Sequence, residues 1–383
     1  MRDAVIVAAL RTATGKRNGA LSGRHPVDLS AEILTALVDR TGIDPALVDD
    51  VVWGCVTQSG EQSGNVGRYA ALAAGFPETV AGVTVDRACG SSQQALEFAA
   101  ATVVAGYRDI VVAGGVESMT RVPMGSARTA GPGKAFGPRV EQRYGRDGFS
   151  QVEGAEILAQ EWGLTRTDVD SYALESHRRA AAAIDSGAFD EQIVPVEVDG
   201  GRFDTDEGVC RGGTSATLGK LATVGADGVV TAGNASQISD GAAGLLVMTS
   251  ERARQLGLDP LVRIHSAAVA GVDPVTMLTG PIPAAEKVLK AAGLTPGDIG
   301  AFEVNEAFAS VPLAWLAEIG ASADRVNPLG GAIALGHPLG ASGARLMTTL
   351  VHHMRANGIR YGMQTMCEAG GMANATIVEL VEP

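Results

Sequence analysis

Short apolar runs that end in glycine alternate along this chain with stretches whose apolar residues recur at helical spacing. The N-terminal run M-R-D-A-V-I-V-A-A-L-R reads as a strand, and buried strands are predicted again near Ile110 and Met363. Helix patterns that stop at a glycine precede the last two. Alternation of this kind predicts an α/β protein whose parallel or mixed sheets carry helices on their faces.

This order of elements occurs twice, which indicates two similar halves. Residues 44–52 and residues 295–303 each follow a helix pattern, start a short turn at a proline and lead into an apolar strand. Residues 89–115 and residues 341–367 each combine a glycine-rich turn, a helix, a glycine stop and a buried strand. The repeat therefore predicts two halves built on the same plan.

The pattern of charged residues changes between the halves, from about residue 119 to residue 240. Six basic residues occur early in this stretch: Arg121, Arg128, Lys134, Arg139, Arg143 and Arg146. They either attract a phosphorylated ligand or form a solvated surface loop. A helical run is predicted after them, over about residues 151–186. We predict that residues 119–240 form an inserted loop domain, that residues 1–118 plus about 241–260 form the first half, and that about 261–383 form the second.

Composition and charge limit the classes of protein to which the chain can belong. A chain of 383 residues with 46% hydrophobic and 19% charged residues is globular and long enough for two or three domains. A net charge of −13 and a pI near 5.0 argue against broad nucleic-acid binding and favour a cytoplasmic protein. The four scattered cysteines indicate a reducing compartment and not a disulfide framework. The N-terminal run is too short for a signal peptide, and no apolar stretch reaches membrane-spanning length.

Four short segments carry the candidate chemistry. They are R-A-C-G-S-S around Cys89, N-E-A-F-A from Asn305, G-H-P-L-G-A-S-G around His337 and C-E-A-G-G from Cys367. Claisen-type acyl transfer on a thioester needs a thiolate, a base for an α-carbon proton and donors for an oxyanion. Because active residues of open α/β folds gather at strand ends, the repeat predicts that these segments converge.

Cys89 and His337 are the candidate nucleophile and base. Cys89 is predicted at the start of a helix, where unpaired N–H groups and the helix dipole favour the thiolate. The alternative is a small buried hydrophobic residue. His337 is predicted at a loop end before a helix, where it can activate a thiol, and its alternative is a buried structural imidazole.

Cys367 and Asn305 complete the candidate set. A second cysteine is useful when protons must move on and off carbon as well as a leaving thiolate. The Asn305 amide can donate to an oxyanion directly or through a water molecule, or it can cap the helix predicted after it. No C-x-x-C or Cys/His cluster occurs, so no metal site is expected.

In this order the four segments resemble the thiolase family along the whole chain, and T-A-G-N-A-S from Thr231 resembles its coenzyme A-contacting strand. The resemblance implies a five-layered α/β/α/β/α core from two similar halves, with a loop domain over coenzyme A. It also implies homodimers or homotetramers, no permanently bound cofactor, and coenzyme A and acyl-CoA as partners.

The resemblance also implies a role for each residue. Cys89 would carry the acyl group, His337 would activate it, and Cys367 would protonate the leaving acetyl-CoA carbanion. Asn305 would hold a water that forms one oxyanion hole with His337, and the backbone N–H groups of Cys89 and Ala369 would form the other. The implied coenzyme A contacts are Ala232, Ser236, Ala307, Phe308 and, for a phosphate, Arg211.

Two departures from the family pattern bear on the substrate. Glu368 and Ala369 stand where the second-cysteine motif is usually glycine-rich. The short-chain acetoacetyl branch commonly has a His-Met pair where this chain has Ser150 and Gln151. These departures favour a degradative relative that acts on bulky or steroid side-chain thioesters.

The predicted function is thiolytic cleavage of 3-ketoacyl-CoA by CoA, giving acetyl-CoA and a shortened acyl-CoA in fatty acid or steroid degradation. The first alternative is a biosynthetic acetoacetyl-CoA thiolase. A decarboxylating condensing enzyme on a carrier protein has no need of Cys367. A non-catalytic thiolase-like protein that binds acyl or sterol ligands has no need of the four chemical residues.

Overall fold

The computed structural model describes residues 2–129, 131–225 and 227–381. The strands are β1 (Val5–Thr12), β2 (Gly15–Lys16), β3 (Asp50–Gly54), β4 (Ala81–Val85), β5 (Ile110–Ser118), β6 (Ile193–Val194), β7 (Val196–Val198), β8 (Gly201–Phe203), β9 (Ser239–Met248), β10 (Val262–Gly271), β11 (Ala301–Val304), β12 (Tyr361–Glu368) and β13 (Met372–Leu380). The α-helices are α1 (Pro26–Thr41), α2 (Val66–Ala73), α3 (Ser91–Ala105), α4 (Ser126–Thr129), α5 (Pro138–Tyr144), α6 (Gln151–Glu161), α7 (Arg166–Asp185), α8 (Ser215–Leu218), α9 (Ser250–Gln255), α10 (Pro281–Ala292), α11 (Ser310–Ile319), α12 (Ala332–Leu335) and α13 (Leu339–Asn357). Short 3-10 helices cover Ala20–Gly23 (η1), Pro45–Leu47 (η2), Gly60–Gln62 (η3) and Pro296–Asp298 (η4).

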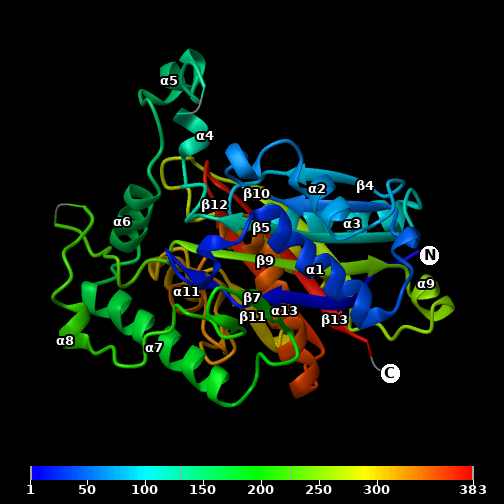
Figure 1. The fold of residues 1–383 in the computed structure, drawn as a ribbon. Coiled ribbons are helices and arrows are strands. Elements are labelled where there is room, and N and C mark those ends of the chain that lie inside the picture. The colour runs from blue at the N-terminus through cyan, green and yellow to red at the C-terminus, as the bar shows by residue number, and fades with distance from the viewer. Residues whose placement is uncertain (1, 130, 226, 382–383) are drawn as a thin grey trace.

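One mixed sheet runs through the molecule in the order β11-β12-β13-β10-β1-β9-β5-β3-β4 (Figure 1). Its two ends are built alike: β3 and β5 are parallel and lead through antiparallel β9 to β1, and β11 and β12 are parallel and lead through antiparallel β13 to β10. The halves join where β1 pairs with β10 over only Val5↔Arg263 and Ile6↔Val262. The predicted repeat of one plan is thus visible in the strand pairing.

The apolar core shows how the layers stack. On β5, Ile110 and Val112 pack with α1 and α2, whereas Val111 and Ala113 pack with α3 and α13 on the other face. The α3–α13 cluster also takes in Val378 of β13, so these two helices lie between the two half-sheets. Helices α10 and α11 cover the outer face of the second half-sheet. This stacking is the predicted five-layered α/β/α/β/α core, and the central strands β5, β9, β12 and β13 are buried on both faces, as strands between two layers of helices are.

Both predicted repeats form as expected. Pro45 and Pro296 each open a 3-10 turn that leads into β3 and β11, respectively. Helices α3 and α13 each end at a glycine in the left-handed region, Gly106 at φ 78° and Gly358 at φ 60°, as helix C-caps favour. Helix α3 leads into β5, which is parallel to β3, and helix α13 leads into β12, which is parallel to β11. The two halves therefore repeat the same helix-to-strand connection.

Residues 119–238 connect β5 to β9, which pair with each other in the sheet, and within this segment the two-residue strand β6 pairs with β1. Helices α4 and α5 project from the body at the top of Figure 1, whereas α6, α7 and α8 lie together beside it. The helical run predicted over residues 151–186 is two helices, because α6 ends at Glu161 and Thr165 caps the start of α7. This excursion supports the predicted loop domain.

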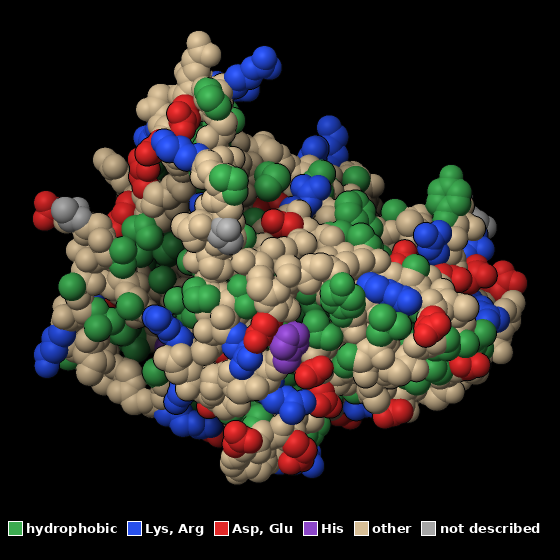
Figure 2. All heavy atoms as spheres, turned by 45° about the horizontal axis from the view of Figure 1, so that its top comes forward, with side chains coloured by type: hydrophobic (Ala, Val, Ile, Leu, Met, Phe, Trp, Pro, Cys, Tyr) green, Lys and Arg blue, Asp and Glu red, His purple; other side chains and the backbone are tan. Residues whose placement is uncertain are grey.

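The projecting segment carries basic and acidic side chains side by side (Figure 2). None of the helices in the described part of the chain is long and apolar enough to cross a membrane.

Candidate active site

Cys89 lies in a tight turn between β4 and α3. The helix begins at Ser91 with Gly90 as its N-cap, so Cys89 precedes the helix and does not start it. Ala88 has φ 46°, a left-handed conformation that is uncommon for alanine. The turn is held by the Ala88 N–H, which donates to Asp86 Oδ1 (2.7 Å), and by Ser91 Oγ, which donates to the Ala88 carbonyl (2.6 Å). Strain fixed by surrounding hydrogen bonds is typical of a functional turn.

The predicted lowering of the Cys89 pKa is wrong for the resting site. Burial raises the pKa of Cys89 to about 12, and the Glu368 carboxyl group adds to the increase. The backbone N–H groups of Cys89 and Ala369 donate to the sulfur and lower its pKa, but less than burial raises it. Cys89 therefore rests as a thiol. The two amides predicted to form an oxyanion hole both point at its sulfur.

His337 lies between α12 and α13, where Pro338 caps the second helix. Its Nδ1 is 2.6 Å from Ser342 Oγ, and the Ser342 hydroxyl donates to the Pro338 carbonyl (2.8 Å). Because the Ser342 hydroxyl already donates its hydrogen to Pro338, it can only accept a hydrogen bond from His337. The hydrogen of the neutral ring is therefore on Nδ1. Burial, and then the positive charge of Arg345, lower the pKa of His337 to about 3. The ring is neutral, and its Nε2 carries no hydrogen and can accept a proton.

Asn305 follows β11 directly and faces that nitrogen. Its Nδ2 lies 3.4 Å from His337 Nε2, and its backbone N–H donates to the Thr365 carbonyl on β12 (3.0 Å). Helix α11 begins only at Ser310, with Ala309 as its N-cap, so the capping alternative for Asn305 is wrong. Asn305 Oδ1 is buried with no hydrogen-bond partner among the described residues, and a water molecule is the small donor that suits it.

Cys367 lies near the end of β12 and is 1% exposed. Burial raises its pKa well above the ordinary value, and the next largest cause is the negative charge of Cys89. The two sulfur atoms are therefore close enough to influence each other. All four predicted residues are buried, and the contacts join them in pairs: the charge of Cys89 acts on Cys367, and Asn305 lies beside His337. Leu339 of the His337 segment shares an apolar cluster with Cys89, which links the two pairs.

The segments predicted to contact coenzyme A lie against one another. The Ser236 N–H donates to the Ala307 carbonyl (2.9 Å), and Ala235 forms an isolated bridge with Phe308. Ala307 and Phe308 share an apolar cluster with Cys367, so this wall leads to the second cysteine. Ala232, in the same loop, is exposed.

Arg211, the predicted phosphate partner, pairs with an acidic side chain in this structure. Arg211 forms an ion pair with Asp185 on α7 (2.8 Å) at the surface.

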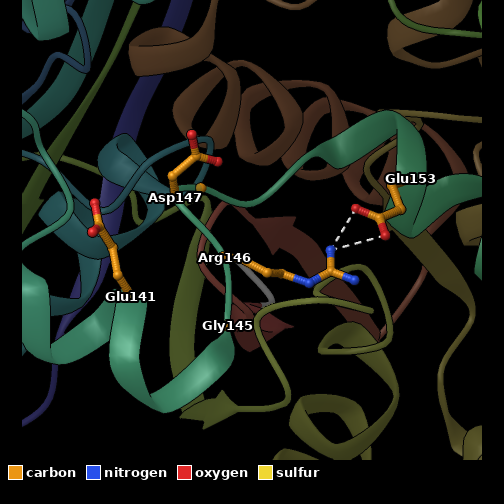
Figure 3. Close-up of a pocket in the computed structure, with 6 residues that line it drawn as sticks. Glu141, Gly145, Arg146, Asp147 and Glu153 are labelled. Atoms are coloured by element: carbon orange, nitrogen blue, oxygen red, sulfur yellow. Dashed lines mark hydrogen bonds and ion pairs between the residues drawn. The ribbon is translucent and has the colours of Figure 1, made fainter.

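Of the six basic residues in the projecting stretch, three form ion pairs with acids: Arg121 with Glu61, Lys134 with Glu141 and Arg146 with Glu153. Figure 3 shows Arg146 and Glu153 in a depression that Glu141 and Asp147 also line. This mixture of charges favours the solvated-loop alternative over a phosphate cradle.

Two contributors to the site were not predicted. Ser342 sets the tautomer of His337, and Arg345 adds to the effect of burial, which lowers the pKa of His337. Ser342 was within the quoted G-H-P-L-G-A-S-G segment, and its position in the first turn of a helix opened by His-Pro was the available signal. Arg345 reads as an ordinary helix residue in sequence. Among the described residues, no group of three or more His, Cys, Asp or Glu side chains is arranged to hold a metal ion.

Comparison with known proteins agrees with this geometry. The thiolase N-terminal domain matches residues 4–251, and the thiolase C-terminal domain matches residues 258–380. The chain belongs to the thiolase family, which is a family of acyltransferases.

Two curated relatives and one solved structure are similar over nearly their whole length. The chain is 50% identical to the steroid 3-ketoacyl-CoA thiolase of Mycobacterium tuberculosis, over 99% of this chain and 94% of that protein. It is 44% identical to the 3-ketoacyl-CoA thiolase of Aeromonas salmonicida, over 100% of both. The crystal structure of the Bacillus anthracis acetyl-CoA acetyltransferase superposes with a TM-score of 0.92 at 38% identity, covering 100% of this chain and 99% of that one.

Proposed function

We propose that the chain catalyses thiolytic cleavage of 3-ketoacyl-CoA by CoA, giving acetyl-CoA and a shortened acyl-CoA. The observation that carries the proposal is one buried site with two thiols that influence each other, Cys89 and Cys367, and a neutral imidazole whose Nε2 is unprotonated and faces Asn305. Two relatives, a steroid 3-ketoacyl-CoA thiolase and a 3-ketoacyl-CoA thiolase, align over 99% and 100% of the chain. A hydrolase or a decarboxylating condensing enzyme has no use for the second thiol.

In the first half-reaction Cys89 Sγ attacks the 3-keto carbon, and His337 Nε2 accepts the thiol proton. The backbone N–H groups of Cys89 and Ala369 bind the resulting oxyanion. Cleavage of the bond between C2 and C3 leaves the electron pair on C2, and the Cys367 thiol protonates it, which releases acetyl-CoA. Cys89 then holds the shortened acyl group as a thioester.

In the second half-reaction CoA attacks the thioester carbonyl, and the Cys367 thiolate accepts the CoA thiol proton. The backbone N–H groups of Cys89 and Ala369 also bind this oxyanion, because its oxygen is the former 3-keto oxygen on the carbon that Cys89 holds. A water molecule held by Asn305, together with His337, binds the thioester oxygen of the acetyl-CoA carbanion in the first half-reaction. Cys89 leaves as a thiolate and takes its proton back from His337. CoA acts as a co-substrate, and no resident cofactor is needed.

The acyl group is proposed to be long or bulky. Beside Cys367 and Phe308 lie large apolar side chains from the loop domain and the segment after β10, among them Met277, Leu278 and, partly buried, Trp162. Ser150 stands where the short-chain branch commonly has histidine, and in this chain it caps helix α6. The second candidate is short-chain acetyl transfer, the activity for which the similar Bacillus anthracis acetyl-CoA acetyltransferase is named.

Coenzyme A is proposed to lie along Ala232, Ser236, Ala307 and Phe308. Arg211 is proposed to reach its phosphate by exchanging its surface partner, because exposed ion pairs are weak.

A homodimer or homotetramer is also proposed. Strand β4 ends the sheet with residues that are all at least partly exposed, and an edge strand of this kind can pair with a second copy. Exposed Phe98 and Val104 on neighbouring α3 add apolar surface. A cytoplasmic location stays a prediction.

The test combines turnover with trapping. We expect acetyl-CoA to form from 3-ketoacyl-CoA plus CoA, with mass spectrometry placing the acyl group on Cys89. Cys89→Ser should abolish both, and Cys367→Ala should stop exchange of the acetyl-CoA methyl protons with solvent. An acyl group on Cys367, or normal exchange in the Cys367 variant, would reverse the assigned roles. A series of substrates from acetoacetyl-CoA to polycyclic thioesters decides between the two substrate classes.

A further inference from the structure

Glu368 places a carboxyl group beside the nucleophile. Successive residues of a strand point to opposite faces, so Glu368 and Cys367 leave β12 on different sides. Glu368 is fully buried and lies against the turn that carries Cys89. A Cβ placed on Gly90 would stand 2.0 Å from Glu368 Oε1, so only glycine at that position leaves room for the carboxyl group.

The surroundings of Glu368 are polar but poorly paired. Both of its carboxyl oxygens are buried with no hydrogen-bond partner among the described residues. The same is true of three nearby atoms, Arg87 Nε, Gln94 Oε1 and Asn374 Oδ1. Asn374 Nδ2 donates to the Gly90 carbonyl (3.3 Å), which joins this cluster to the nucleophile turn. A carboxyl group that has no internal partner is free to change its protonation without breaking a hydrogen bond.

The charged and titratable groups near Glu368 come from several elements. Arg87 precedes the nucleophile turn, Glu97 lies on α3, and the charge of Glu368 acts on both thiols, Cys89 and Cys367. From β13 the facing side chain is the uncharged Asn374. Glu368, Glu97 and Arg87 therefore form a charged cluster close enough to act on both reacting sulfur atoms.

We propose that Glu368 is a positioning residue that controls the charge of the nucleophile. Ionised Glu368 opposes formation of the Cys89 thiolate, and protonated Glu368 does not. The inference rests on the proposed function for the identity of the nucleophile, and it adds a residue that the reaction scheme above does not use.

The direction of the effect follows from burial. Burial raises the pKa of Glu368 to about 8, Arg87 opposes this increase, and Glu97 adds to it. Glu368 is therefore protonated at pH 6.5 and ionised at pH 9.5. Because Glu368 in turn raises the pKa of Cys89, the thiolate fraction should climb with pH, level off near pH 8, and climb again.

The experiment measures alkylation of Cys89 by iodoacetamide from pH 6.5 to pH 9.5, with the labelled peptide followed by mass spectrometry. Glu368→Gln keeps the shape and removes the charge. We expect equal rates at pH 6.5 and a rate about tenfold above that of the wild type at pH 9.5, as a thiol pKa lower by one unit implies. Superimposable profiles, or an increase of the same size at every pH, would overturn the proposal.

Glu97→Gln tests the same point with Glu368 in place. Removing Glu97 removes a cause of the raised Glu368 pKa, so the plateau should move to lower pH. An unmoved plateau overturns the proposal even if Glu368→Gln fails to fold. Alkylation needs no turnover, so a chain that does not cleave 3-ketoacyl-CoA but shows the plateau would refute the proposed function and leave this inference standing.

Discussion

Three glycines set the distance between the strand ends and the His337 segment, and a methyl group at Gly115 should disturb it. Gly54 and Gly115 are paired across β3 and β5, and Gly340 lies in the first turn of α13 above them. A Cβ on Gly115 would stand 2.1 Å from the Gly340 carbonyl oxygen, whereas ordinary contact begins at 3.4 Å. The Gly115→Ala variant must therefore move the start of α13 by about 1.3 Å, because backbone cannot rotate away as a side chain does.

The displacement acts on catalysis because Gly340 is three residues after His337. A misplacement of about 1 Å can cost on the order of 10²-fold in rate, and overpacking of a buried site costs about 1–3 kcal/mol of stability. We expect Gly115→Ala to remain folded with a lower midpoint of urea unfolding and to lose about 10²-fold in kcat/KM for thiolysis.

The assay pairs steady-state thiolysis with urea unfolding, and Gly23→Ala is the matched control. Gly23 has no atom within 4 Å of an added Cβ and lies at the surface, so its variant should behave as the wild type. Normal kcat/KM in Gly115→Ala would refute the claim that close backbone approach places His337. A loss of equal size in Gly23→Ala would show that the method responds to any added methyl group.

Three other predictions concern buried polar groups. Ser342→Ala removes the acceptor of the His337 Nδ1–H, and a lost hydrogen bond of about 0.5–1.5 kcal/mol should slow acylation of Cys89 up to about tenfold in a single-turnover assay. Asp206→Ala leaves the buried Arg11 guanidinium without its two-pronged partner and should lower the free energy of unfolding by about 3–5 kcal/mol in urea. Burial raises the pKa of Glu303 from 4.5 to about 8, so the folded chain holds the Glu303 proton more tightly than the unfolded chain does. The stability that this proton contributes is complete below pH 4.5 and is lost as the pH rises to about 8. This part of the pH dependence should disappear in Glu303→Gln.

Each of these has an outcome that contradicts it. An unchanged acylation rate in Ser342→Ala would mean that the tautomer is held without the hydroxyl. Asp185→Ala, which breaks the exposed pair with Arg211, is the control for Asp206→Ala and should leave the unfolding midpoint unchanged. Equal losses in the two variants would refute the role of burial. A Glu303→Gln profile parallel to the wild type between pH 5 and pH 8.5 would assign the pH dependence to other groups.

The order and type of the elements could be predicted from sequence because they depend on local patterns. Apolar spacing and glycine stops identified the two repeats, and Pro45 and Pro296 open the predicted turns. The break between α6 and α7 was missed, although Thr165 and Asp168 form a capping box there. Roles that rest on the family motifs, such as those of Cys89 and His337, remain predictions that the geometry supports.

What the sequence alone determined is therefore the α/β plan, the two halves and the set of reactive side chains, since each is written in the identity and spacing of neighbouring residues. Only the tertiary structure decided the protonation of Cys89 and His337, the tautomer that Ser342 sets, and the side of β12 on which Glu368 lies. The physical reason is that burial outweighs the helix dipole at Cys89. Burial sums contributions from residues far apart in the chain, and no local pattern records that sum.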